Sequence, residues 1–439
     1  ASRAIGETMI VVLAAGVAVG TLYLLASRLY DRLTGLIAAG LLATSVTFWF
    51  YSEITYPYTT LAAGTTVLAL VALALRRGVL PGARGAAVAA LTWGLLSGFR
   101  QDLLLFLAPL FLVAMWGRPA REWAAAVGAG TIGVAAWFVP SAALSEGIAK
   151  YVAATMGQGE AASGSSSVFT QGFAAFQANA HTLWIFLHAG IRFVLPGIAY
   201  ALLRRLAWLR HPDPALRWLV LWAAPPLIFY LFGHIGDYGY TLSILPALMV
   251  IAARGIALAG RDGAALLARL AALRRSHLAP RRVRGLTRPT LALALAAVLI
   301  LSSTTAFVRR HTVLSAAGIT CFDQTMAARL RIVPERFPPD ETLIFSSAYY
   351  QHVRYYLPQY QVWFWEPVHG PQAEQRIPSG TRWLVIFEEV VHPSESESGF
   401  ASIALPCNNT PFYYTAVNPG DIARFDANAR TISVERRGE

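Results

Sequence analysis

The sequence predicts an all-α polytopic membrane bundle of about ten transmembrane helices, followed by a small extracytoplasmic α/β domain. The 439-residue chain is 56% hydrophobic and only 14% charged, whereas soluble domains carry about 25% charged residues. Apolar stretches of spanning length recur through the first 310 residues. The short loops between these stretches alternate between Arg-rich and Arg-poor, as they do in multi-pass membrane proteins.

The expected helices follow the apolar runs in order. They cover residues 9–27, 34–50, 58–75, 86–98, 103–116, 122–142, 181–203, 217–233, 239–258 and 290–308. Most have the roughly 17–25 residues that a spanning helix needs. Two runs, 86–98 and 103–116, are shorter and reach only about 20 Å across a hydrocarbon core of about 30 Å. Their connection, Arg100-Gln101-Asp102, is therefore expected below the outer membrane surface.

The placement of arginine predicts the orientation of the bundle. One set of alternate loops, including the connection 254–289, carries twenty arginines, whereas the opposite set carries Arg3, Arg100 and Lys150. The positive-inside rule makes the first set cytoplasmic and places everything after residue 308 outside an inner (plasma) membrane. The net charge of +12 is then explained by loops that face anionic lipid, and nucleic acid is not an expected partner.

The outer side is expected to carry a long loop and a separate domain. Loop 143–180 contains a Gly/Ser-rich stretch at 157–167 that is typical of a flexible segment, either a substrate-covering loop or a passive one. After a transmembrane domain over 1–310, residues 311–439 alternate predicted strands and helices, which indicates an α/β domain. This domain holds both cysteines of the chain, and the sequence leaves open whether they pair.

Polar and aromatic residues of the predicted bundle gather at its outer side. Ionisable groups are costly at membrane depth and usually face a polar cavity or a partner, so these residues predict a pocket open to the outer leaflet. Arg192 is expected in the middle of helix 181–203, and the others at helix ends and turns. The members are Glu53, Tyr56, Arg100, Asp102, Arg192, His234, Asp237 and Tyr240.

Phosphate binding is the chemistry that this pocket favours. Arginine binds phosphate oxygens bidentately and stays charged, so Arg100 and Arg192 are candidate phosphate-binding residues. Glu53 and Asp102 are weak candidates for a general base. Purely structural roles are also open: Glu53 could cap a helix, and Arg100 and Asp102 could form an ion pair with each other. The sequence holds no nucleotide-binding, zinc or nucleophile-elbow motif, so no cofactor is expected, and a divalent metal is left open.

Three stretches of the chain resemble a known superfamily. They are Phe48–Glu53 with Tyr56-Pro57-Tyr58, Gly98–Leu110, and Gly233–Tyr240 running into Leu245-Pro246-Ala247-Leu248. They are similar to motifs of GT-C integral-membrane glycosyltransferases, in particular family-39-like bacterial proteins. The resemblance implies transfer of a sugar from a polyprenyl-phosphate donor to an extracytoplasmic acceptor. It also implies that Tyr56, His234, Asp237 and Tyr240 line the substrate pocket.

The resemblance has one departure, which concerns the catalytic base. Such enzymes rely on an acidic residue in the first extracytoplasmic loop, but no Asp-Asp or Asp-Glu pair precedes residue 30 here. We therefore expect that the chain as given begins after that loop and lacks the usual base. The alternative is a non-catalytic GT-C-like scaffold subunit of a membrane complex. A transporter is less favoured, because no inverted repeat is visible.

Overall fold

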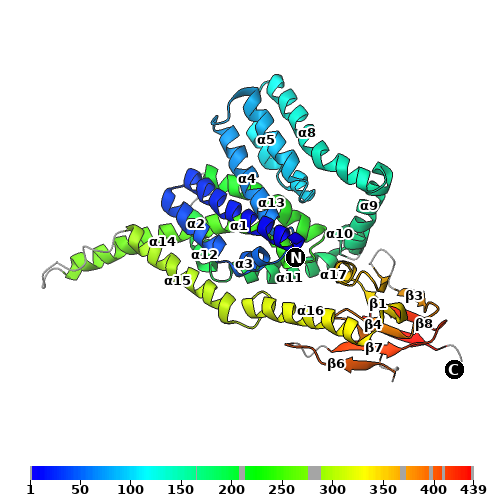
Figure 1. The fold of residues 1–439 in the computed structure, drawn as a ribbon. Helices are drawn as coiled ribbons and strands as arrows, with labels where there is room; N and C mark the ends of the chain where they lie inside the picture. Colours follow the sequence, from blue (N-terminus) through cyan, green and yellow to red (C-terminus); the bar gives the residue numbers. More distant parts are fainter. Residues whose placement is uncertain are drawn as a thin grey trace. The chain divides into compact units, whose positions relative to one another are not determined.

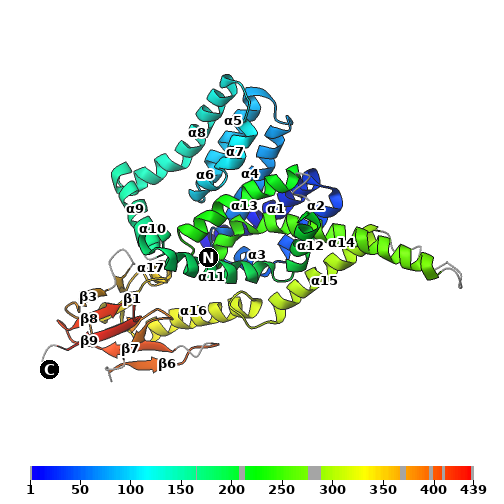
Figure 2. The same cartoon turned by 180° about the vertical axis from the view of Figure 1, so that it is seen from behind.

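The computed structural model describes residues 2–164, 166–206, 213–274, 288–365, 372–394, 399–407 and 411–436. Internal contacts divide the chain into two compact units. The first unit comprises Ala1–Met156 and Ser163–Arg310, and the second comprises Gly157–Ala162 and His311–Glu439. The first unit is helical, whereas the second combines helices with two β-sheets (Figures 1 and 2).

Helices account for the chain up to residue 309. They are α1 (Ser2–Leu29), α2 (Arg32–Ala43), α3 (Val46–Glu53), α4 (Tyr58–Arg76), α5 (Gly82–Leu96), α6 (Asp102–Phe106), α7 (Ala108–Met115), α8 (Ala120–Leu144), α9 (Ile148–Gly164), α10 (Val168–Gln171), α11 (Phe173–Ile191), α12 (Leu195–Leu206), α13 (Pro214–Phe232), the 3-10 helix η2 (Tyr238–Ser243), α14 (Leu245–Arg274) and α15 (Arg288–Arg309). Among the described residues, five helices are long and apolar enough to cross a membrane, or up to seven if each bent pair is one span. The predicted multi-pass helical bundle is confirmed.

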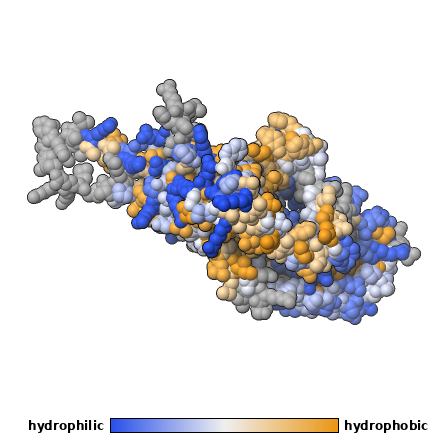
Figure 3. All heavy atoms as spheres, turned by 90° about the horizontal axis from the view of Figure 1, so that it is seen from above, coloured by the Kyte–Doolittle hydropathy of each residue, from blue (hydrophilic) through white to orange (hydrophobic). Residues whose placement is uncertain are grey.

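The outer surface of the helices is apolar, as a lipid-facing surface should be. Leu13, Ile132 and Leu301 keep 65–66% of their surface exposed, which is unusual for large apolar side chains in a soluble protein. Figure 3 shows broad orange areas on the face that it draws. Between helices, small residues permit close backbone contact: a Cβ added to Gly94 of α5 would lie 2.6 Å from the carbonyl oxygen of Gly130 in α8. These two helices lie side by side in both ribbon views.

Two of the expected continuous helices bend sharply, and two others, 103–116 and 239–258, are divided at Leu107 and Ile244. The run 34–50 bends by 58° between α2 and α3, where Ser45 is extended and its hydroxyl donates to the carbonyl of Gly190 at 3.1 Å. The run 181–203 bends by 101° between α11 and α12. Pro196 explains this second break, because proline lacks the amide proton and clashes with the preceding helical turn. Arg192 therefore lies at the end of α11, and its prediction in mid-helix was wrong.

Two expected loops are helical. Within the predicted loop 143–180, α9, α10 and α11 occupy most of the described residues, so a wholly flexible loop was a wrong interpretation. Five alanines in α9 give it high helix propensity despite its glycines. The predicted connection 254–289 is also helical as far as Arg274, because that stretch is rich in Ala, Leu and Arg, which are strong helix formers. Residues 275–287 lie outside the described part.

The second unit is a small α/β region. Its elements are α16 (Ala316–Arg336), the 3-10 helix η4 (Pro339–Glu341), β1 (Thr342–Ser346), α17 (Tyr350–Tyr356), β2 (Gln361–Phe364), β3 (Gln372–Arg376), β4 (Trp383–Ile386), β5 (His392–Pro393), β6 (Ala401–Ile403), β7 (Phe412–Ala416), β8 (Ile422–Asp426) and β9 (Thr431–Glu435). One sheet has the order β2-β1-β4-β7-β6, with β1 parallel to both of its neighbours. The other has the order β3-β8-β9-β5. The predicted α/β character is confirmed.

Strand periodicity places two cores on opposite faces of the five-stranded sheet. Ile344 and Val385 belong to one buried cluster together with residues of α16. Their strand neighbours Phe345 and Ile386 belong to a second cluster together with residues of β8 and β9. Since successive strand side chains point to opposite faces, α16 covers one face and the four-stranded sheet packs on the other.

Candidate functional site

Arg100 and Asp102 form a tight ion pair between α5 and α6. Nε of Arg100 donates to both carboxylate oxygens of Asp102 at 3.2 Å, and Nη2 donates to Oδ2 at 2.6 Å. The two side chains are 17% and 19% exposed. In the described part of the chain, all hydrogen bonds of the Arg100 side chain go through these two nitrogens, so the Nη1 edge of the guanidinium remains uncommitted.

Two tyrosine rings, one from α4 and one from η2, pack against the Arg100 guanidinium. Its central carbon lies 4.7 Å from the ring centroid of Tyr240 in η2 and 5.4 Å from that of Tyr58 in α4. Tyr230 of α13 packs edge-on against Tyr240, with centroids 5.6 Å apart, and its hydroxyl shares a 3.0 Å hydrogen bond with Ser243. Cation–π contacts of this kind are strongest where water is excluded. They fix the plane of the guanidinium.

Asp237 anchors the turn that carries Tyr240. Its Oδ1 accepts a hydrogen bond from the amide of Gly239 at 2.8 Å and another from the hydroxyl of Tyr51. Gly239 must be glycine for this packing, because an added Cβ would lie 2.1 Å from Cδ2 of Tyr58. The carboxylate of Asp237 is thus engaged in positioning η2 against α3 and α4.

His234 and Tyr56 complete the cluster. Nδ1 of His234 lies 2.8 Å from the hydroxyl of Ser166, and its ring meets Tyr240 edge-on with centroids 5.9 Å apart. Tyr56 stacks on Tyr58 with centroids 5.9 Å apart and is 53% exposed, so it lies at the rim. We call the set the Arg100 cluster; it comprises Tyr51, Tyr56, Tyr58, Arg100, Asp102, Tyr230, His234, Asp237 and Tyr240.

Six of the eight predicted site residues fall in the Arg100 cluster, and Glu53 and Arg192 make their contacts elsewhere. Glu53 is exposed and accepts a 2.9 Å hydrogen bond from the indole of Trp49, which stacks on Phe307. Nε of Arg192 is buried without a hydrogen-bond partner in the described structure, and Arg310 is near enough to repel its charge. None of these contacts joins either residue to Arg100.

Sequence reasoning missed Tyr51, Tyr58 and Tyr230 as members of the cluster. The spacing of tyrosines at 51, 56 and 58 around Pro57 was the available signal, but only Tyr56 of these three was predicted as a site residue. Within the described residues, no group of three His, Cys, Asp or Glu side chains is placed to hold a metal ion. The permanently charged cation of the Arg100 cluster is Arg100 itself.

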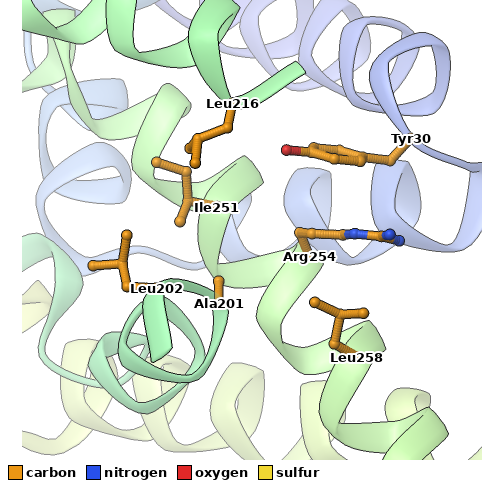
Figure 4. Close-up of a pocket in the computed structure, with 7 residues that line it drawn as sticks. All are labelled: Tyr30, Ala201, Leu202, Leu216, Ile251, Arg254 and Leu258. Atoms are coloured by element: carbon orange, nitrogen blue, oxygen red, sulfur yellow. The ribbon is translucent and has the colours of Figure 1, made fainter. Parts of the chain in front are cut away.

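A separate small hollow lies away from these residues. Figure 4 shows its lining, in which the guanidinium of Arg254 lies beneath the ring of Tyr30. The central carbon of Arg254 is 4.8 Å from the Tyr30 ring centroid, and Nη1 is 3.4 Å from Oδ2 of Asp31. No predicted site residue lines this hollow.

The fold is shared with a solved protein structure. The chain is similar to the crystal structure of ArnT from Cupriavidus metallidurans bound to undecaprenyl phosphate, with a TM-score of 0.57 and 15% identity over 93% of this chain and 83% of that chain. The apo structure of the same protein gives a TM-score of 0.54 and 14% identity over the same shares. No protein-family model matches, and no curated protein sequence matches. At this identity, the likeness establishes the fold, as the sequence motifs predicted.

Proposed function

We propose that this protein is a membrane glycosyltransferase that takes its sugar from a polyprenyl-phosphate donor. The observation that carries the proposal is the Arg100 guanidinium, held by Asp102 and two tyrosine rings with its Nη1 edge uncommitted. The Arg100 guanidinium is an oriented, permanently charged hydrogen-bond donor within an apolar bundle, which suits the binding of a lipid-linked phosphate. The ArnT-like fold supports this choice, since the solved ArnT binds undecaprenyl phosphate.

In the proposed reaction, Arg100 stabilises the leaving phosphate. An acceptor hydroxyl attacks the anomeric carbon, the bond from that carbon to the phosphate oxygen breaks, and the polyprenyl phosphate leaves with the additional negative charge. Nη1 of Arg100 is placed to hydrogen-bond to that phosphate, and preorganised donors of this type lower the barrier because they need no reorientation. Asp102 is a positioning residue, since its carboxylate holds Nε and Nη2.

The acceptor proton needs a base, and the contacts distinguish the two weak candidates. Both carboxylate oxygens of Asp102 are engaged by Arg100. Glu53 is exposed, and in the described structure its side chain accepts a hydrogen bond from the neutral indole of Trp49. Of the two, Glu53 is therefore the better candidate.

Arg192 and Arg310 support a second anion contact. Nε of Arg192 is buried without a hydrogen-bond partner in the described structure, and an anion would supply one. We propose that the phosphate of the polyprenyl-phosphate sugar donor binds at Arg192 before it reaches Arg100. The proposed orientation follows the arginine asymmetry: the Arg-rich loops face the cytoplasm, and the C-terminal unit and the acceptor lie outside an inner membrane.

Binding of undecaprenyl phosphate to the detergent-solubilised full chain tests the proposal, with native mass spectrometry as the readout. The wild type is expected to bind, and Arg100→Ala to bind at least about tenfold more weakly, as expected for loss of a charge-assisted contact. Arg118→Ala is the matched control, because Arg118 is also 17% exposed and pairs with Glu122 at 2.7 Å. Equal binding by wild type and Arg100→Ala would remove the role given to Arg100.

A further inference from the structure

The two cysteines of the second unit meet at one point of α16. The hydroxyl of Thr325 donates to the carbonyl of Pro406 at 2.9 Å, and Sγ of Cys407 lies 2.9 Å from Oε1 of Gln324. Cys321 precedes Thr325 by four residues and therefore lies on the same face of the helix. Cys321 is thus about one helical turn from Gln324 and Thr325, the residues that contact Cys407 and Pro406.

The backbone at Cys407 is held in an unusual conformation. Its φ of 64° lies in the left-handed region, which few residues other than glycine, asparagine and aspartate occupy. Such conformations persist where surrounding contacts over-determine them. Here the neighbouring Pro406 carbonyl is fixed by Thr325, so the contact between the chain at 406–407 and α16 is a defined one.

We propose that Cys321 and Cys407 form an intramolecular disulfide that links α16 to the segment following β6. Disulfides persist in oxidising compartments, so the inference rests on the proposed function's placement of the second unit outside the cytoplasm. The bond would close a long loop containing β1, α17, β2, β3 and β4. Closing a long loop stabilises a fold chiefly by restricting the unfolded chain.

Exposure sets the order of the exchange reaction. Cys407 is exposed and Cys321 is partly buried, so the Cys407 thiolate attacks one sulfur of an oxidant disulfide, such as oxidised glutathione or a protein disulfide. Cys321 then attacks the Cys407 sulfur of the mixed disulfide. The oxidant takes up two electrons and leaves as two thiols, which carry the two protons lost by the cysteines. Partial burial raises the pKa of the Cys321 thiol, which lowers its thiolate fraction and favours Cys407 as the first attacking group.

Peptide mapping of the full-length protein tests the bond. Membranes are treated with N-ethylmaleimide before any reduction, and the purified chain is digested with trypsin. The expected product is a pair of disulfide-linked peptides, residues 311–329 and 383–424, which separate on reduction. Reduction is also expected to lower the melting temperature of the wild type by on the order of 10 °C, with no such change in Cys321→Ser. Recovery of both cysteines alkylated without reduction overturns the proposal.

A second variant separates failure of the disulfide from failure of the predicted topology. Ala429 is exposed in the turn between β8 and β9, so Ala429→Cys in a Cys321→Ser, Cys407→Ser background reports the side of the membrane. Suppose that both native cysteines of the wild type are alkylated without reduction. If an impermeant maleimide then labels the Ala429→Cys variant from outside, the disulfide is refuted and the predicted topology is retained. Alkylated native cysteines without external labelling refute both.

Discussion

Two arginines, one in each unit, have similar neighbours but different surroundings. Arg100 and Arg329 each lie over a tyrosine ring and near a carboxylate. Arg100 is on a short loop, is 17% exposed, and holds a carboxylate two residues away at 2.6 Å. Arg329 is on α16 and 1% exposed; its Nη1 donates to the carbonyl of Phe387 at 3.1 Å and lies 3.9 Å from Glu389.

Under the proposed function, this difference separates a ligand site from a structural contact. The Arg100 pair is local, so its guanidinium would stay oriented if a phosphate bound to its other edge. Arg329 instead joins α16 to the end of β4 within the core through Nη1, and the nearby Glu388 accepts hydrogen bonds from the same unit. Glu388 accepts from the Ser346 hydroxyl at 3.0 Å and from the amide of Ser347 at 2.6 Å. A buried arginine beside a carboxylate is therefore not by itself evidence of a site.

Removing the Arg100 side chain should have the largest effect on activity. We expect Arg100→Ala to lower sugar transfer by about 10²–10³-fold, because the leaving phosphate loses its preorganised donor. The measurement is release of polyprenyl phosphate from a polyprenyl-phosphate-linked sugar in membranes. Unchanged size-exclusion behaviour and melting temperature serve as the folding control. Wild-type turnover by this variant would contradict the assigned role.

Removing the Arg329 side chain should affect stability and not donor binding. Arg329→Ala leaves Glu389 without its partner and opens a cavity beside the core, and we expect a loss of about 3 kcal/mol in the unfolding free energy. Thermal unfolding and limited proteolysis of the full chain measure it. Arg331→Ala is the control on the same helix, because Arg331 is 70% exposed and should change stability by less than about 0.5 kcal/mol. A loss of undecaprenyl phosphate binding without unfolding would contradict the structural role of Arg329.

The sequence predicted the elements better than their breaks and contacts. Apolar length and arginine placement identified the bundle, and strand composition identified β1 and β4. The bend at Arg192 depends on one proline, Pro196, inside an otherwise continuous apolar run. Hydrophobic periodicity is assessed over many residues, so a single proline does not reveal the bend. The cluster around Arg100 draws on α3, α4, α13 and η2, which are distant in sequence, so local patterns could indicate its residues but not which of them meet.

Packing of η2 against α4 provides a milder test of the Arg100 cluster. Gly239→Ala would place a methyl group 2.1 Å from the Tyr58 ring, so either Tyr58 or η2 must move away from Arg100. We expect overpacking to cost about 1–3 kcal/mol in the unfolding free energy, accompanied by weaker undecaprenyl phosphate binding. Gly128→Ala is the control, because a Cβ there meets nothing within 4 Å. Unchanged binding by Gly239→Ala would mean that the Tyr58–Tyr240 arrangement does not matter.

The smallest expected effect is a pH dependence confined to the second unit. Burial lowers the pKa of His352, with nearby Glu388 opposing the shift, and Nδ1 is buried without a hydrogen-bond partner in the described structure. The folded state thus keeps this imidazole neutral, whereas the unfolded chain takes up a proton as the pH falls below about 6.5. The stabilisation is fully present above that pH and is lost as the pH falls toward the lower folded-state pKa.

Thermal unfolding of the full chain at about pH 7.5 and about pH 5.5 measures this contribution across the titration range of histidine. We expect His352→Leu to reduce the acid-induced fall in melting temperature by a few degrees. His392→Leu is the matched control, because His392 is exposed on β5 and should leave the fall unchanged. The same fall in wild type and His352→Leu would assign the pH dependence to other groups. The contrast between the two units would then rest on Arg100 and Arg329 alone.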